Sequence, residues 1–204
     1  MAKESTLKNM LLTLLIITFV SSAVVGFVYS LTEKPIGEVK KKKIKASIEQ
    51  VIPAFDTVTT FKVADDGDSL VFYSATKNGA AVGTAIETFD NNGFSGHISI
   101  MVGFLPDGTI NGVAVLSQNE TPGLGAKMSE KQKEGAKPAF TTQFLGKNPI
   151  NFKLAVTKDG GNVDAITAST ISSRAFCLAV QRAYDALKAH QAADMDYSQL
   201  VNAE

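Results

Sequence analysis

The chain has 204 residues, with 45% apolar side chains and a formal net charge of zero. This length gives room for one ordinary domain with an appendage, and the apolar fraction excludes wholesale disorder. The charge is unevenly divided, because residues 1–45 hold 8 basic and 3 acidic side chains, whereas residues 46–204 hold 12 and 17. No nucleic-acid partner is expected for the acidic part, since phosphate binding requires a basic surface.

Cysteine and histidine are too scarce to build a metal centre. Cys177 is the only cysteine, so the chain can form neither an internal disulfide nor a thiolate cluster. The two histidines, His97 and His190, are far apart in the sequence. We therefore predict no metal site, and any redox chemistry would have to be carried by an organic cofactor.

Residues 10–31 form an uncharged, mostly apolar run of 22 residues. As a helix this run would be about 33 Å long, enough to cross a hydrocarbon core of about 30 Å. A cleaved signal peptide is the alternative, because Lys3 and Lys8 precede the run and residues 21–23 would serve as a small-residue cleavage site. The apolar run continues well past that site, however. We predict an N-terminal tail at residues 1–9 and a transmembrane helix at residues 10–31.

The charges that flank the predicted span leave its orientation open. Two lysines precede it, and six follow it between residues 34 and 45. The positive-inside rule alone would place the following domain in the cytoplasm. That rule is weakest for long translocated domains, and the lysines could instead contact lipid headgroups or form the polar face of a helix.

A second helical pattern follows the span. Val39, Ile44, Ile48 and Val51 lie near one helical stripe, which ends before Pro53. We therefore predict a basic linker with an amphipathic helix at residues 32–52, followed by one soluble domain at residues 53–204.

The soluble domain alternates strand and turn signals before it ends in a helix. Strands are predicted, in chain order, over residues 69–74, 81–89, 97–105, 110–117 and 152–157. Residues 126–145 are typical of a helix with a break near Pro138, and residues 172–189 have the clearest helical periodicity. The predicted fold class is α+β, with a small antiparallel sheet packed with helices.

Residues 164–173, with the sequence DAITASTISS, precede the last predicted helix. The free N–H groups of a helix start, together with the positive end of the helix dipole, favour an anionic phosphate. A threonine hydroxyl at this point could hydrogen-bond a phosphate or be esterified to it. Taken alone, the run is explained more simply as capping of the helix by Thr170, Ser172 or Ser173.

Residues 120–125, with the sequence ETPGLG, follow the fourth predicted strand. The proline and the two glycines permit a tight turn whose backbone approaches a ligand. Glu120 and Thr121 could supply polar contacts to a flat heterocycle. The segment lacks the spacing of a dinucleotide fingerprint or of a P-loop, so alone it indicates little more than a turn.

Together, these two segments resemble a known family. The chain is similar to the G subunit of the Rnf electron-transport complex and to its relative, the C subunit of the sodium-pumping NADH:quinone reductase. The resemblance covers most of the chain, including the span, residues 93–96, residues 120–125 and residues 164–173. The family's attachment motif reads roughly Asp-x-x-Ser/Thr-Gly-Ala-Thr-x-Ser/Thr, and its fixed positions are matched here by Asp164, Thr167, Thr170 and Ser172. This chain departs from the motif with Ala168 and Ser169, both of which are small.

The resemblance implies an FMN-binding domain with a covalent flavin. In this family a flavin transferase moves FMN from FAD onto the motif threonine as a phosphoester, so Thr170 would be the attachment residue. Ser169 adds a neighbouring hydroxyl that could compete as the acceptor. We expect the FMN ring or ribityl chain to be lined by Glu120, Thr121, Leu124 and Gly125.

The resemblance also implies an electron carrier with no substrate turnover of its own. Its partners would be the membrane subunits and the iron–sulfur or flavin subunits of a complex that couples ferredoxin/NAD electron transfer to Na⁺ or H⁺ translocation. The resemblance also implies that the domain lies on the extracytoplasmic face of the bacterial inner membrane. The lysine count favours the cytoplasm, but long domains cross the membrane largely regardless of charge. Two alternatives stay open: the C subunit of the quinone reductase, which the short chain disfavours, and a membrane-tethered binding module without a cofactor.

Overall fold

The structure is a computed structural model that describes residues 6–65, 67–130 and 139–201. The chain divides into two compact units, Met1–Lys43 and Ile44–Glu204. The first unit contains most of helix α1 (Leu7–Val51), and the second contains the end of that helix and a mixed α and β domain.

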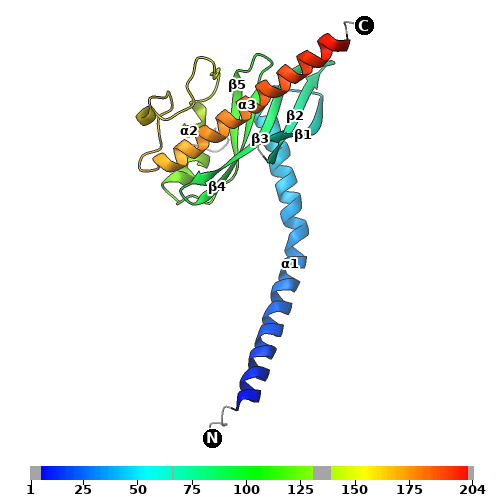
Figure 1. The fold of residues 1–204 in the computed structure, drawn as a ribbon, viewed down its shortest axis with the longest axis vertical. Helices are drawn as coiled ribbons and strands as arrows, with labels where there is room; N and C mark the ends of the chain where they lie inside the picture. The colour runs from blue at the N-terminus through cyan, green and yellow to red at the C-terminus, as the bar shows by residue number, and fades with distance from the viewer. Residues whose placement is uncertain (1–5, 66, 131–138, 202–204) are drawn as a thin grey trace. The chain divides into compact units, whose positions relative to one another are not determined.

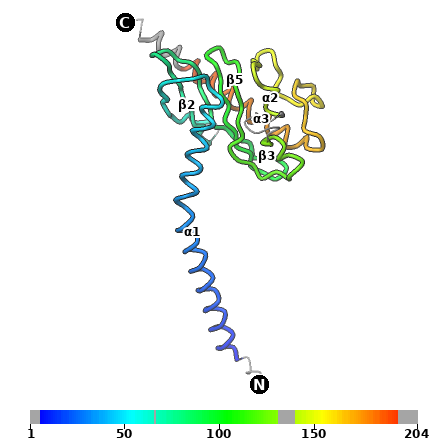
Figure 2. Tube along the Cα trace, turned by 180° about the vertical axis from the view of Figure 1, so that it is seen from behind, coloured from blue at the N-terminus to red at the C-terminus, as the bar shows by residue number. Residues whose placement is uncertain are grey.

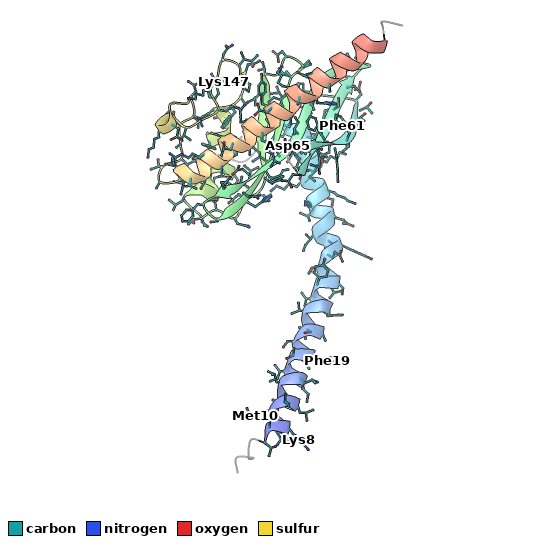
Figure 3. The ribbon with its side chains drawn as sticks, in the orientation of Figure 1. Lys8, Met10, Phe19, Phe61, Asp65 and Lys147 are labelled. Carbon is teal, nitrogen blue, oxygen red and sulfur yellow. The ribbon has the colours of Figure 1, made fainter. Side chains whose placement is uncertain are left out.

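Helix α1 is long and apolar enough to cross a membrane. Its large apolar side chains are exposed in the first unit, including Met10 and Phe19, which project outward from the helix (Figure 3). A helix that is apolar all round is stable only where lipid or other apolar groups surround it. The first unit therefore has the length and composition of a membrane anchor.

Helix α1 continues through Pro35 without interruption. Proline removes the hydrogen bond to the carbonyl group four residues earlier, which here belongs to Leu31. Leu31 is the last residue of the predicted span, where water can replace the lost donor. The span and the amphipathic segment, which have separate signals in the sequence, are thus joined in one helix.

The second unit is built on a five-stranded antiparallel sheet in which each strand pairs with the next along the chain (Figure 1). The strands are β1 (Thr57–Asp65), β2 (Asp68–Lys77), β3 (Ala80–Gly93), β4 (Gly96–Phe104) and β5 (Ile110–Ser117). Gly93 pairs with Gly96, so only Phe94 and Ser95 form the tip of the hairpin between β3 and β4.

Helix α3 (Thr170–Val201) packs along one face of this sheet (Figure 1). Phe176 and Val180 of the helix are fully buried, together with Phe72 and Ile100 of the strands. Burying each such side chain stabilises the folded state by about 1.5–3 kcal/mol. The contact between α3 and the sheet therefore forms the main core of the domain. The hydroxyl of Thr88 on β3 donates a hydrogen bond to the carbonyl of Ala179 (3.1 Å) inside the core.

The opposite face of the sheet receives the end of α1 (Figure 2). Val51 is fully buried there, and two strand glycines make room for it. A side chain at Gly103 would collide with the Val51 carbonyl, and a Cβ at Gly112 would lie 2.9 Å from the Val51 Cα. Asn111 donates a hydrogen bond to the Val51 carbonyl (2.8 Å), which satisfies one of the free acceptors at the helix end.

The predicted α+β class with an antiparallel sheet is confirmed, and so are the strands at β2 to β5 and the helix at α3. The prediction missed β1. It was wrong for residues 152–157, which contain only an isolated bridge from Val156 to Val163 and the start of a short 3₁₀ helix, η2 (Thr157–Asp159). In place of one broken helix over residues 126–145, the described residues there form a 3₁₀ helix, η1 (Gly125–Ser129), and a single turn, α2 (Ala139–Thr142). The expected break near Pro138 lies outside the described residues.

Candidate functional site

A cavity of about 310 Å³ opens where three segments that are distant in the sequence meet. These segments are the tip of the β3–β4 hairpin at Phe94, the turn at residues 120–125, and the start of α3. Ten residues line the cavity, and none of them is a lysine, arginine or histidine: Phe94, Glu120, Thr121, Leu124, Gly125, Ala168, Ser169, Thr170, Ile171 and Ser172.

The start of α3 leaves several backbone donors at the cavity. Ala168 adopts a left-handed conformation (φ +60°), and the helix then begins at Thr170. Ser173 is the first residue whose N–H bonds back along the helix, to the carbonyl of Ser169 (3.0 Å). The N–H groups of residues 170–172 precede this first helical bond, and all three residues line the cavity. The positive end of the helix dipole adds to their preference for an anion.

The hydroxyl groups of residues 169–173 have different environments. The Ser173 hydroxyl is buried and donates to the Ser169 carbonyl (2.9 Å) while it accepts from the Ile166 N–H (3.0 Å). The Ser172 hydroxyl is also buried and donates to Glu120. Ser169 is 7% exposed, whereas Thr170 is half-buried and lines the cavity. Thr170 therefore combines the best access from solvent with a position at the helix start.

Glu120 is a buried acid in the wall of the cavity, with 5% of its surface exposed. One carboxylate oxygen, Oε1, accepts the N–H of Ser95 (3.0 Å), and the other, Oε2, accepts the hydroxyl of Ser172 (2.6 Å). Gly93 and Gly125 leave the space that the carboxylate occupies, because a Cβ on either glycine would come within 2.6 Å of it. Hydrogen bonds to both oxygens offset the cost of burying this group.

The rim of the cavity carries large apolar side chains that face solvent. Phe94 is 68% exposed, Ile171 49% and Leu124 40%. Exposed apolar side chains grouped around a cavity are typical of a binding site rather than of a stable bare surface. The arrangement suits a ligand with a flat apolar ring and a phosphate group.

All six cofactor-binding residues that the sequence indicates lie on this one cavity: Glu120, Thr121, Leu124, Gly125, Ser169 and Thr170. Sequence reasoning did not include Phe94, Ala168, Ile171 or Ser172 among them. An aromatic residue between two glycines at a hairpin tip was a usable signal for Phe94. The bond from Ser172 to Glu120 joins residues 52 positions apart, and no local pattern indicates it.

Two other reactive side chains lie away from the cavity. Cys177 is buried in the core, and burial raises the pKa of its thiol to about 12. His97 is exposed, pairs through Nδ1 with Asn91 (2.8 Å) and packs against Phe89. In the part of the chain that the structure describes, no three His, Cys, Asp or Glu side chains are grouped in a way that could hold a metal ion.

Comparison with known proteins gives the family. Residues 93–185 match the family model of the FMN-binding domain. The chain is 34% identical to the G subunit of the ion-translocating oxidoreductase complex of Aliivibrio fischeri, over 92% of this chain and 93% of that protein. The chain belongs to the family of this G subunit. The similarity extends to the same subunit in Shewanella piezotolerans (34% identity, 89% of each chain) and in Methanosarcina acetivorans (30% identity, 94% of this chain and the whole of that protein).

The match to the FMN-binding domain coincides with the cavity, whose lining residues all fall within residues 93–185. The residues present also fit the chemistry of FMN. The apolar rim suits the isoalloxazine ring, and the donors at the start of α3 suit the phosphate. The half-buried Thr170 hydroxyl lies beside these donors in the cavity wall.

Proposed function

We propose that this protein is a membrane-anchored electron carrier whose FMN is attached to Thr170 through a phosphoester. The observation that carries the proposal is the position of Thr170 as the first residue of α3, half-buried and in the wall of the cavity. A phosphate attached to its hydroxyl would remain beside the free N–H groups of residues 170–172.

Attachment requires a flavin transferase and FAD. The Thr170 Oγ1 atom would form a bond to the phosphorus of the FMN half, the pyrophosphate bond of FAD would break, AMP would leave, and the hydroxyl proton would be released. Ser169 is less accessible, and the hydroxyls of Ser172 and Ser173 are held in buried hydrogen bonds. We therefore assign Thr170 rather than its neighbours as the acceptor.

In this proposal the protein holds the cofactor and has no substrate of its own. Bound FMN would supply one- and two-electron transfer. Leu124 and Ile171 would contact the ring from the rim, and their exposure would leave one edge of the site open to a redox partner. The partners would be the other subunits of an ion-translocating complex, by analogy with the relatives, which belong to an ion-translocating oxidoreductase complex. Coupling of ferredoxin and NAD to Na⁺ or H⁺ transport is part of this proposal.

We further propose that the domain lies on the extracytoplasmic face of the bacterial inner membrane. A covalent tether is useful there because a dissociated flavin could not easily be replaced. Protease added to intact spheroplasts should then digest the domain, and digestion only after lysis would contradict this orientation.

The central proposal is tested by producing the full chain in a host that expresses the transferase. The denatured protein should fluoresce as a flavin on a gel, and its intact mass should exceed the sequence mass by one FMN less one water. Thr170→Ala should abolish both signals, whereas Ser169→Ala should retain them. A dark wild-type band with an unchanged mass would contradict the proposal and favour a tethered binding module without a cofactor.

A further inference from the structure

We propose that Glu120 is the positioning residue of the flavin site and that its negative charge keeps the reduction potential of FMN low. This inference rests on the proposed function, because it requires FMN in the cavity. Glu120 has no chemical step assigned to it, so its role would be to shape the site and to set its electrostatics.

The positioning role follows from the three segments that Glu120 joins. Its backbone belongs to the turn after β5, where its N–H donates to the side chain of Gln118 (2.6 Å). Its carboxylate bonds to Ser95 at the tip of the β3–β4 hairpin and to Ser172 in the first turn of α3. These three segments carry all the residues that line the cavity. One side chain therefore fixes the distances between the walls.

Two glycines lie close against the carboxylate of Glu120. A Cβ at Gly93 would lie 2.6 Å from Oε1, and a Cβ at Gly125 would lie 2.6 Å from Oε2. Glycine at both positions lets the backbones approach the acid from two sides. This degree of enclosure goes beyond what a turn requires and indicates a site built around a buried acid.

The electrostatic role follows from the charges near the acid. Among the described residues, the ion pairs are those that Arg174 and Arg182 form with aspartates, so no described cation pairs with Glu120. In the part of the chain that the structure describes, its charge is offset by hydrogen bonds and by the start of α3, not by an ion pair. A charge that is shielded from water and not paired acts over longer distances than one in solvent.

Reduction of FMN by two electrons with uptake of one proton adds negative charge to the ring. A fixed negative charge in the cavity wall opposes this change, so the oxidised form is favoured and the potential is lower. Removing the charge without changing the shape should therefore make the potential more positive.

Glu120→Gln makes that change, because an amide oxygen can still accept the Ser95 N–H and the amide nitrogen can donate to the Ser172 oxygen. The midpoint potential of the attached FMN should shift to a more positive value in this variant, measured by spectroscopic redox titration with mediators. Glu87→Gln is the matched control, since Glu87 pairs with Tyr73 on the other face of the sheet and its loss should leave the potential unchanged. Equal potentials for Glu120→Gln and wild type would overturn the electrostatic role.

Ser172→Ala separates charge from shape. It removes a hydrogen bond to Glu120 but retains the charge, so the potential should not become more positive. A positive shift of the same size in both variants would mean that disorder of the site, and not the charge, sets the potential, and would overturn the inference.

The positioning role is measured on the flavin-free protein. The Ser95 amide, which donates to Glu120, should be protected from hydrogen exchange in wild type and in Glu120→Gln, and should lose protection in Glu120→Ala. Retained protection in Glu120→Ala would overturn this role. Because this readout needs no FMN, its result is independent of the proposed function, which fails instead if the wild-type mass does not increase.

Discussion

Substitution of Gly125 by alanine tests how tightly the wall of the cavity is built. The added Cβ would lie 2.6 Å from Glu120 Oε2 and 2.6 Å from Ser172 Oγ, closer than real contacts of this kind. To admit the methyl group, the carboxylate and the hydroxyl must move apart and lose their 2.6 Å hydrogen bond. Overpacking a core costs about 1–3 kcal/mol, and a buried acceptor left without its donor costs about 1–3 kcal/mol. Together these two costs should lower the free energy of unfolding by roughly 2–6 kcal/mol.

Gly123→Ala is the matched control two residues away. Gly123 has a positive φ of 77°, but no atom lies within 4 Å of an added Cβ, so only backbone strain of about 1–2 kcal/mol is expected. Both variants of the full chain in mild detergent can be unfolded with urea and followed by the accessibility of the domain to protease. The reasoning fails if Gly125→Ala is no less stable than Gly123→Ala.

Two further predictions concern the domain away from the cavity. Burial raises the pKa of the Cys177 thiol from 9.0 to about 12, so at pH 8 its thiolate fraction is about a thousandfold below that of an exposed thiol. Iodoacetamide should therefore leave Cys177 unmodified in the native protein and react with it in urea. Fast labelling of the native protein would contradict this burial. Asn111→Ala removes the hydrogen bond to the Val51 carbonyl, so the free energy of unfolding in urea should fall by about 0.5–1.5 kcal/mol. Asn119→Ala, at an exposed position, is the control and should lower it by less than about 0.5 kcal/mol. Equal effects would argue against the role of Asn111.

Local sequence patterns were sufficient to predict the helices and strands that bury one face. Helix α3 has a continuous apolar stripe, and β4 and β5 flank the strong turn signal of Asp107 and Gly108, so both could be predicted. Strand β1 could not, because it lies at the edge of the sheet and pairs with β2 alone, and no residue of it is fully buried. Residues 152–157 show the opposite error, since a short alternation of apolar residues is not specific for a strand.

The functional site, too, could be predicted only in part from the sequence. Its local components, which are the hydroxyl-rich helix start and the turn at residues 120–125, are visible in the sequence. Their contact is not visible, because the bond from Ser172 to Glu120 and the approach of Ser95 to the same acid depend on how the sheet brings the hairpin, the turn and the helix together. That these segments form one site was inferred from the resemblance to a known family, and not from the physical properties of the residues.

The attachment of FMN to Thr170 can be tested directly on one peptide. Cleavage by trypsin after Lys158 and Arg174 releases residues 159–174, which contain Thr167, Ser169, Thr170 and two further serines. We predict that this peptide carries the mass of one FMN less one water and that its fragment ions place the added mass on Thr170. An unmodified peptide from protein made with the transferase, or a modification on Ser169, would contradict the account.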